Sequence, residues 1–337
     1  MQDSDLVKLV IETNDVYKSC KIISLIEEQT ILQELAANNS QQIIVRQAAI
    51  KKIIDQDLLE RLSIYDTEDD IRLEASKKLN SIFILSYLCL KDPNHRIREV
   101  ATKLLPRSQI ETLKKIATSD SHWLVRYTAV WKLDCKSTLQ QISMNDVNIR
   151  VRMTAVERVN DDSVYFKLLM DTTPFDIKLI SARKIQNEVC IMKCLISIKN
   201  SNIREVLVNR LNNQENLKII AITDLNRWVR YTAIEKIIES NENSEFFYKI
   251  AITDIDENVR YSALKKINQT SIFLRIVLNS EFLDSCIAAL NRISNQKDLG
   301  LLRLTAKEYL QPYITNRMQI VSDNDVNSSN QSINSSS

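Results

Sequence analysis

The strongest constraint on this chain is a short pattern that returns about every 26 residues. It is clearest in two nearly identical stretches, AITDLNRWVRYTAIEKI at 221–237 and AITDIDENVRYSALKKI at 251–267. Ten copies align on one position, here called the anchor, with successive gaps of 26, 26, 28, 26, 26, 26, 26, 30 and 26 residues. The anchors are Arg46, Arg72, Arg98, Arg126, Arg152, Lys178, Arg204, Arg230, Arg260 and Cys286. A period of this length is typical of an architecture in which each copy is one structural unit.

Apolar residues hold fixed places around each anchor. The residue before the anchor is Val or Ile in nine copies, the third residue after it is Ala in eight, and the seventh is aliphatic in all ten. These offsets fall on one face of a helix. A further apolar pair, such as Leu59 and Leu62, recurs upstream of the anchor and predicts a shorter first helix. Each copy is therefore expected to be a helix-turn-helix unit that needs its neighbours to bury its apolar face.

An aspartate stands six residues before the anchor in six copies. A carboxylate there is expected to cap the free N–H groups that open the second helix, a contribution of about 1 kcal/mol. It also lies where it could pair with an anchor arginine, and an arginine close to the core needs such a partner. The sequence thus predicts a structural ladder that includes Asp120, Arg126, Asp146, Arg152, Asp224, Arg230, Asp254 and Arg260.

Glycine is nearly absent, with Gly300 the only one among 337 residues. Hairpins and phosphate-binding loops need residues at positive φ, which glycine supplies most readily. The fold class predicted is therefore all-α, an α-solenoid of about ten 26-residue helix-turn-helix repeats. We expect an N-terminal helical cap at 1–29, the repeat solenoid at 30–294, a C-terminal capping helix at 295–318 and a disordered polar tail at 319–337.

The frame D-x(4)-V-R-x-x-A, as in DSHWLVRYTA (120–129) and DLNRWVRYTA (224–233), resembles HEAT repeats. The similarity is to the short form found in bacterial and plastid proteins, which include phycobilin lyase subunits. It covers about residues 30–294 and implies an Asp–Arg hydrogen-bond ladder between repeats, with second helices that line a concave, partner-binding face. The copies at Lys178, Arg204 and Cys286 depart from the frame, so the ladder is expected to be interrupted there.

Few residues in the chain suit catalysis. His95 and His122 are the two histidines, and neither is followed by the glutamate that iron-binding HEAT-fold hydroxylases carry in their repeated His-Glu pairs. A glycine-rich nucleotide loop is impossible with one glycine. We therefore expect no metal, no cofactor and no independent enzymatic activity. The resemblance implies that any activity would be of the bilin lyase type and would require a partner subunit.

Cysteines and the N-terminal segment bear on the compartment. The six cysteines are scattered, with no C-x-x-C pair, and are expected to be buried in a protein of a reducing compartment. The first residues, MQDSDLVKLVIE, are acidic where a signal peptide would be basic, and no apolar run approaches about 18 residues. The sequence thus predicts a cytoplasmic or plastid stromal protein with no membrane span.

A basic residue stands six positions after the anchor in nine of the ten copies, in a set that includes Lys132, Arg158, Lys184, Arg210, Lys236 and Lys266. One interpretation is a basic ribbon that faces an acidic partner or a phosphate backbone. The other is that each cation complements the dipole of its own helix, a contribution of about 0.3–1 kcal/mol. The formal net charge of only +2 argues against nucleic acid as the main partner.

Five aromatic residues point away from the apolar stripe on a helical wheel: Tyr127, Trp131, Trp228, Tyr231 and Tyr261. Tyr127 and Trp131 are four residues apart, and Trp228 and Tyr231 are three apart, so each pair should cluster on a helix surface unless neighbouring repeats cover it. Trp and Tyr are common anchors of binding interfaces. We therefore expect a non-enzymatic scaffold that binds another protein. The alternatives are a phycobilin lyase-like or chaperone-like factor for bilin proteins and a nucleic-acid-binding solenoid.

Overall fold

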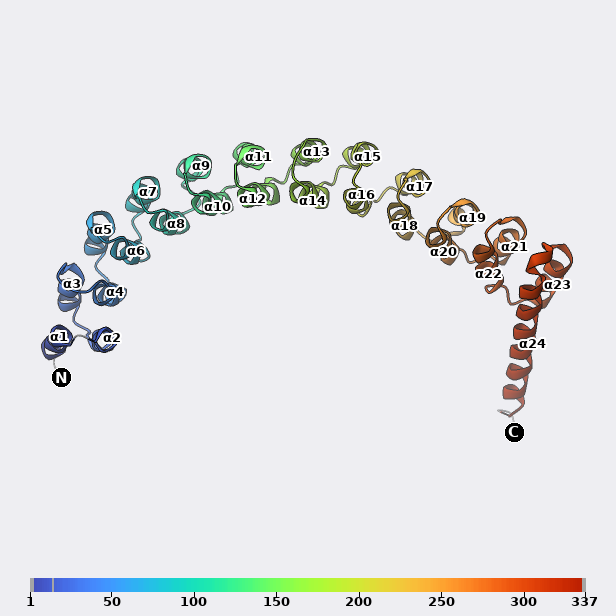
Figure 1. Ribbon diagram of the computed structural model, residues 1–337, viewed down its shortest axis with the longest axis horizontal. Helices are drawn as coiled ribbons and strands as arrows, with labels where there is room; N and C mark the ends of the chain where they lie inside the picture. Colours follow the sequence, from blue (N-terminus) through green and yellow to red (C-terminus); the bar gives the residue numbers. More distant parts are fainter. Residues whose placement is uncertain (1–2, 14, 335–337) are drawn as a thin grey trace. The chain divides into compact units, whose positions relative to one another are not determined.

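The computed structural model describes residues 3–13 and 15–334 of the chain. These residues form α-helices and two short 3-10 helices, with no strand in the described ranges (Figure 1). The chain divides into two compact units, Met1–Val164 and Tyr165–Ser337, and the division falls within α13 (Asp162–Met170). None of the described helices is both long enough and apolar enough to cross a bilayer.

The helices of the first unit are α1 (Asp3–Glu12), α2 (Val16–Leu25), α3 (Gln29–Ala37), α4 (Ile43–Lys52), α5 (Gln56–Tyr65), α6 (Asp69–Ser76), α7 (Ile82–Lys91), α8 (His95–Leu104), α9 (Ile110–Ser119), α10 (Trp123–Lys132), α11 (Lys136–Asn145) and α12 (Ile149–Val159). Those of the second unit are α14 (Phe175–Lys184), α15 (Glu188–Ser197), α16 (Ser201–Val208), α17 (Gln214–Thr223), α18 (Arg227–Lys236), η1 (Asn241–Asn243), α19 (Ser244–Thr253), α20 (Glu257–Lys265), α21 (Thr270–Asn279), α22 (Leu283–Leu290), α23 (Gln296–Thr305), η2 (Glu308–Leu310) and α24 (Gln311–Asn334).

The helix pairs follow the sequence frame. Every anchor lies in the second helix of a pair, from Arg46 in α4 to Cys286 in α22. In the first unit, α4, α6, α8, α10 and α12 pack side by side in chain order, and in the second unit α14, α16, α18, α20 and α22 do the same. The all-α fold and the α-solenoid of tandem helix pairs are therefore confirmed.

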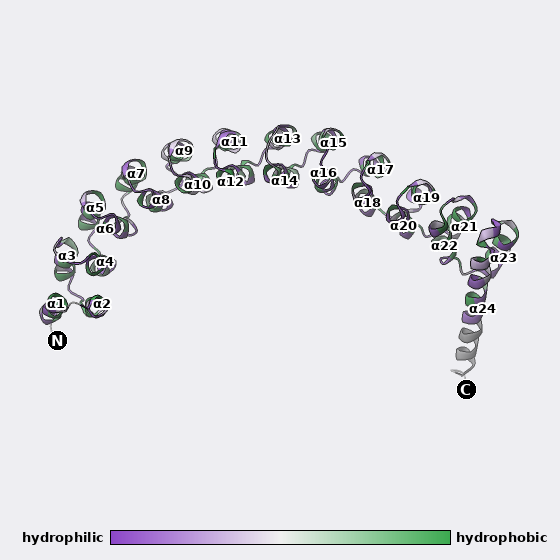
Figure 2. Ribbon diagram, viewed as in Figure 1, coloured by the Kyte–Doolittle hydropathy of each residue, from purple (hydrophilic) through white to green (hydrophobic). Residues whose placement is uncertain are grey.

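The core of each unit consists of the residues that the frame places on the apolar stripe. In the repeat of α7 and α8, for example, Ile97, Ala101 and Leu105 are fully buried, and Leu85 and Leu88 of the first helix are almost so. Ala101 has the small side chain that lets the neighbouring second helices approach. The helix ribbons carry both hydrophobic and hydrophilic residues (Figure 2), as expected of helices that each bury one face.

The turn aspartates play a different part from the one expected. Asp120 is the C-cap residue of α9, and its carboxylate accepts a hydrogen bond from the main-chain N–H of His122 at 2.8 Å. His122 is itself the N-cap of α10, and its ring accepts from the N–H of Leu124. The prediction that the aspartate caps the second helix is therefore wrong, because the N-cap of that helix is His122, two residues after the aspartate.

The ends of the chain continue the pairing. In the segment expected to be an N-terminal cap, α1 packs on α2 and α2 on α4. The Asp3 carboxylate accepts from the N–H groups of Glu27 and Glu28 at 2.9 and 2.8 Å, which fixes α1 to the start of α3. Residues 1, 2 and 14 of this segment lie outside the described residues.

The C-terminal segment differs from the sequence-based expectation of one capping helix at 295–318 and a disordered tail at 319–337. Two helices are present, and the second of them, α24, continues to Asn334, while 335–337 lie outside the described residues. The first part of α24 is fixed by the buried Ile314 and Val321 and by a hydrogen bond from Arg317 to the carbonyl of Ile293. A helix nucleated in this way gains one further bond for each residue added, so polar residues extend it.

Candidate functional site

Anchor arginines join successive repeats in each unit. The guanidinium of Arg126 donates to both carboxylate oxygens of Asp146 in the next repeat, at 2.7 and 2.8 Å. It also donates to the main-chain carbonyl of Asp120 in its own turn, at 2.9 Å. Both charged side chains are almost completely buried, and the bond to Asp146 raises the pKa of Arg126. The pairs of this kind are Arg46–Asp66, Arg72–Asp92, Arg98–Asp120, Arg126–Asp146, Arg204–Asp224 and Arg230–Asp254.

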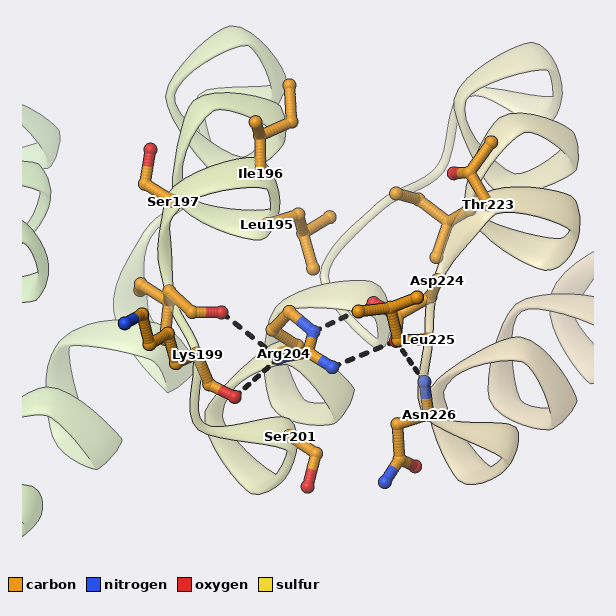
Figure 3. Close-up of a pocket in the computed structure, with 12 residues that line it drawn as sticks. Leu195, Ile196, Ser197, Lys199, Ser201, Arg204, Thr223, Asp224, Leu225 and Asn226 are labelled. Atoms are coloured by element: carbon orange, nitrogen blue, oxygen red, sulfur yellow. Dashed lines mark hydrogen bonds and ion pairs between the residues drawn. The ribbon is translucent and has the colours of Figure 1, made fainter.

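Arg204 shows how the ladder tolerates a changed turn (Figure 3). It donates to both carboxylate oxygens of Asp224 at 2.8 and 2.9 Å, and to the main-chain carbonyls of Ile198 and Lys199 in its own turn. The interruption expected at Arg204 is therefore wrong. Its own turn lacks the aspartate, but the bond to that turn needs only a carbonyl, which every residue has.

Other positions of the ladder vary. Arg152 donates to the main-chain carbonyl of Asp146 at 2.7 Å, and the sequence has Thr172 where the next aspartate would stand. Arg260 donates to Asp284 at 2.7 Å and to the main-chain carbonyl of Asp254 at 2.8 Å. Asp284 lies two residues before its anchor rather than six. An arginine can thus reach a carboxylate from another place in the next repeat.

The pocket drawn in Figure 3 is open, with a volume of about 810 Å³, and it surrounds the bonded pair Arg204 and Asp224. Leu225 and Ile196 at its rim are 95% and 82% exposed. Because the guanidinium and the carboxylate are already bonded to each other and to the main chain, they offer few free hydrogen-bonding groups to a ligand. The pocket is therefore a consequence of how the ladder residues pack, and it does not indicate a binding site.

The basic residues six positions after the anchor contact the preceding repeat. Lys266 donates from Nζ to the carbonyls of Glu235 and Ile237, both at 2.8 Å, and Arg158 donates to the carbonyl of Leu133 at 3.0 Å. Lys132, Lys236 and Arg210 bond in the same way to the carbonyls of Lys103, Asn209 and Ile185 respectively. Lys184 is exposed. These carbonyls lie at the end of the previous second helix, where no intrahelical partner is available.

Five of the six predicted ribbon residues are therefore half-buried and engaged as helix caps, and partial burial lowers the pKa of Lys132 and Lys236. Neither sequence interpretation anticipated this geometry. Each cation stabilises the C-terminus of the neighbouring repeat's helix, and its charge is only partly available to an outside ligand.

Three aromatic side chains form a row along α10, called here the α10 aromatic strip: Trp123, Tyr127 and Trp131. The Tyr127 ring makes edge-to-face contacts with Trp123 and Trp131, at centroid distances of 6.4 and 6.3 Å. Trp131 is 43% exposed, while Trp123 and Tyr127 are half-buried. The spacing of four residues places all three rings along one side of the helix.

The strip continues beyond α10. The guanidinium of Arg150 lies 5.6 Å from the Trp123 ring centroid, and that of Arg158 lies 5.8 Å from Trp131. At the other end of α10, the His122 ring stacks on His95 of α8 at 3.8 Å and contacts Trp123 at 6.1 Å. Burial, together with the charge of His95, lowers the pKa of His122. The strip and its flanking rings thus draw on α8, α10 and α12.

The predicted aromatics of the second unit are more dispersed. Trp228 and Tyr231 on α18 are in edge-to-face contact at 6.2 Å, and Arg227 lies 5.2 Å from the Trp228 ring. Tyr261 on α20 is 54% exposed and has Lys265 4.9 Å from its ring. Both sequence-predicted pairs, Tyr127/Trp131 and Trp228/Tyr231, therefore form contacts on helix surfaces.

Sequence reasoning missed Trp123 and Arg150. Trp123 lies four residues before Tyr127, so the same spacing argument extends the pair to a row of three. Arg150 stands two residues before its anchor, the same position that the outward-facing Trp228 occupies in its own repeat. What the sequence does not reveal is that α12 packs beside α10 and directs its arginines onto the two tryptophan rings.

In the ranges that the structure describes, no three His, Cys, Asp or Glu side chains come close enough together to hold a metal ion. His95 and His122 have each other's rings as neighbours.

No protein-family model matches the chain, and no curated protein matches it either. Among solved structures, the X-ray structure of YibA from Escherichia coli is 18% identical, with a TM-score of 0.24, and the alignment covers 77% of this chain and 98% of that one. The crystal structure of importin beta in an ammonium sulfate condition is 11% identical, with a TM-score of 0.32, and the alignment covers 93% of this chain and 47% of that one. Likenesses this distant identify no activity or partner.

Proposed function

We propose that this helical-repeat protein is a non-enzymatic scaffold that binds a partner protein on the surface of its second helices. By the resemblance to HEAT repeats, that surface would be the concave one. The observation that carries the proposal is the α10 aromatic strip, whose rings contact one another on a helix surface. Tryptophan and tyrosine supply large contact areas at low conformational cost and dominate the energetics of many interfaces.

The three strip residues stand at positions that the repeat frame does not use for core packing or for bonds between repeats. Core packing is supplied by Val125, Ala129 and Leu133, and inter-repeat bonding by Arg126 and Lys132. Trp131 nevertheless exposes a large part of an indole ring, and exposed aromatic surface of this kind often marks an interaction site. Trp228, Tyr231 and Tyr261 form a second candidate contact area on the same class of helices, in the other unit.

The test is a Tyr127→Ala/Trp131→Ala double variant, used as bait alongside the native chain in lysate of the source organism. We expect the variant to keep its helical circular dichroism and to lose proteins that the native chain retains. A matched control is Tyr65→Ala/Phe83→Ala, because these residues are 79% and 80% exposed but lie in first helices, α5 and α7. The control should retain the same proteins as the native chain.

Retention of every partner by the folded double variant would remove the site assignment. Equal losses from both variants would point to general surface stickiness rather than to a specific interface. Loss from the control alone would move the interface to the first helices.

A second function rests on the D-x(4)-V-R-x-x-A frame alone: a phycobilin lyase-like or chaperone-like factor that acts on bilin proteins, together with a partner subunit. Absence of bilin binding or transfer by the purified chain, alone and with candidate subunits, would exclude it. The six free cysteines support a reducing compartment, the cytoplasm or the plastid stroma, as the place where the protein acts.

Nucleic-acid binding is the weakest of the three functions. The predicted basic ribbon would have to act through cations that already cap helix carbonyls, as Lys236 and Lys266 do. Counterion release requires cations that are free to meet phosphates. Charge reversal of exposed Lys184 should therefore leave the salt dependence of any weak nucleic-acid binding unchanged.

A further inference from the structure

Two arginines of α12 lie over the two ends of the α10 aromatic strip. The Arg150 guanidinium is 5.6 Å from the Trp123 ring centroid, and the Arg158 guanidinium is 5.8 Å from that of Trp131. A cation at this distance from an indole face is attracted to it and held in place. The strip therefore has an aromatic middle, at Tyr127, and a positive charge at each end.

The two charges differ in how far they are already neutralised. Arg158 bonds to the Asp134 carboxylate and to a main-chain carbonyl. Arg150 is exposed, and none of the acidic side chains described in the structure pairs with it. On α8, which packs on the opposite side of α10, Arg96 occupies the same position relative to its anchor and is also exposed. An exposed cation without a carboxylate partner keeps its field available to an incoming anion.

We infer that this surface binds an acidic peptide segment of the partner protein. The segment places an apolar side chain against the α10 aromatic strip and its carboxylates beside Arg150 and Arg96. The inference rests on the proposed function and deepens it by naming the chemistry of the bound segment. Arginine suits this task because its planar fork can bond a carboxylate with two N–H groups.

The positions of the two arginines set the spacing of the charges in the bound segment. Arg150 lies in the first turn of α12 and Arg96 in the first turn of α8, and both helices pack against α10. Packed helix axes are about 8–10 Å apart, so the two arginines are separated by about 16–20 Å across α10. Two carboxylates that reach both would be about five or six residues apart in an extended segment, which rises about 3.3 Å per residue.

Carboxylates interspersed among the cations favour a peptide over nucleic acid. Glu157 is exposed on α12 between the two arginines, Asp134 lies beside Arg158, and Glu99 on α8 pairs with Lys103 at 3.2 Å. A phosphate backbone carries a charge at every nucleotide and would meet these carboxylates along its path. A peptide carries charge only at selected residues and can place neutral ones opposite them.

The experiment selects peptides from a random phage-displayed library on the full-length chain and measures the winners against variants. Arg96→Glu/Arg150→Glu reverses both available charges. Because each residue lies in the first turn of its helix, where a carboxylate is favoured, the variant should fold. Arg61→Glu on the first helix α5 is the control, because Arg61 is also exposed.

We expect selected peptides to be enriched in Asp and Glu, and to bind the Arg96→Glu/Arg150→Glu variant at least about tenfold more weakly, with Arg61→Glu unchanged. Replacing the acids of a winner by lysine should restore part of its affinity for the charge-reversed variant. Selected peptides without acidic enrichment, or acidic winners indifferent to the charge reversal, would overturn the inference.

Two outcomes separate this inference from the function on which it rests. If the selected peptides need Tyr127 and Trp131 for binding but neither Arg96 nor Arg150, the proposed interface is supported and the proposed acidic segment is overturned. If no peptide depends on the strip, both fail. A single-stranded oligothymidylate that binds more tightly than any peptide, and loses binding on charge reversal, would overturn the inference in favour of nucleic acid.

Discussion

The repeats of α9/α10 and α17/α18 use one frame for two different surfaces. Val125 and Val229 are fully buried, as are Ala129 and Ala233, and the arginine anchors of both repeats bond an aspartate of the next repeat. The outward positions differ. Where α10 has Trp131, α18 has Glu235, which bonds Ser262 of the next second helix.

The aromatic rings of the two repeats also receive their cations from different places. In α10 the arginines come from the following second helix, α12, so the surface spans two repeats. In α18 the cation over Trp228 is its chain neighbour Arg227, so the contact stays within one helix. Stacking fixes the buried positions of a repeat and leaves the outward ones free to differ, and chemistry specific to one repeat therefore resides in the outward ones.

The largest expected difference is in chemical reactivity, at the turn after each second helix. The α9/α10 repeat has Cys135 in this turn, and the α17/α18 repeat has Glu239 at the same position. Hydrogen bonding with the hydroxyls of Ser137 and Thr138 lowers the pKa of the Cys135 thiol to about 7, whereas burial raises that of Cys89 to about 12. At pH 7 about half of Cys135 would be thiolate, the reactive form, so it should be alkylated at least about a thousandfold faster than Cys89.

The reaction with iodoacetamide, followed by mass spectrometry of each cysteine peptide, checks this. Because the pKa of Cys135 is depressed, its rate should rise as the pH increases through about 7 and level off above about 8. Cys89 should react only when the chain is unfolded. A Cys135 rate that keeps rising steeply up to pH 9 would contradict the lowered pKa. The expectation that all six cysteines are buried holds for Cys89, Cys194 and Cys286 and is wrong for half-buried Cys20, Cys135 and Cys190.

The next largest effect should be the same in both repeats. Arg126→Met and Arg230→Met each leave a largely buried carboxylate, Asp146 or Asp254, without its cation. We expect each to lower the free energy of unfolding by about 3–5 kcal/mol. Urea unfolding, with amide hydrogen exchange of the flanking helices to localise the loss, measures it.

Lys114→Met is the matched control, because Lys114 pairs with the largely exposed carboxylate of Glu111, and its loss should leave the free energy of unfolding almost unchanged. Adding Asp146→Leu to Arg126→Met should recover much of the loss, since an unpaired buried charge is then absent. If Arg126→Met leaves the free energy of unfolding unchanged, the ladder does not hold the repeats together.

The frame and the helix pairing could be predicted because both depend on side chains at fixed spacing. The apolar stripe, the alanine and the anchor each recur often enough to be counted, and counting places all ten second helices. The Asp–Arg partners lie at a near-constant separation for the same reason. The intact ladder at Arg204 could not be predicted, because the bond to its own turn needs only a main-chain carbonyl. The partner of Arg260 could not be predicted either, because Asp284 stands outside the frame.

The candidate site could be predicted only in part. A helical wheel gives the direction of Tyr127 on its own helix, but it does not show what the neighbouring repeat places over it. Arg150 and the capping contacts of Lys266 both depend on that neighbour. Every residue has a main-chain carbonyl, so these acceptors cannot be recognised from the residue types. The capping role of the basic ribbon therefore could not be predicted from the sequence.

A smaller loss is expected at the capping lysines, again equal in the two repeats. Lys132→Met and Lys236→Met each remove a donor to a carbonyl at the end of the preceding second helix. We expect about 1 kcal/mol of destabilisation from each, the usual net contribution of one hydrogen bond. Lys132→Arg should be nearly neutral, since Arg158 and Arg210 cap in the same way elsewhere. Losses confined to one repeat would show that the cap is not a general part of the frame.

The smallest effect on stability, and the sharpest on function, should come from exchanging the residues that distinguish the two surfaces. Trp131→Glu gives α10 the residue that α18 carries, at a partly exposed position beside Arg158. The new carboxylate can pair with that guanidinium and offset part of the lost ring contacts, so the free energy of unfolding should change by less than about 1 kcal/mol. The same change removes one end of the α10 aromatic strip and places a carboxylate where an acidic segment would bind. Binding of a selected acidic peptide should therefore fall at least about tenfold, measured by fluorescence anisotropy. Trp228→Glu in the second unit should leave that binding intact, because α18 takes no part in the strip. Equal losses from the two variants would mean that the peptide does not distinguish the two surfaces, whereas a loss confined to Trp131→Glu would place specificity in the outward residues that the repeat frame leaves free.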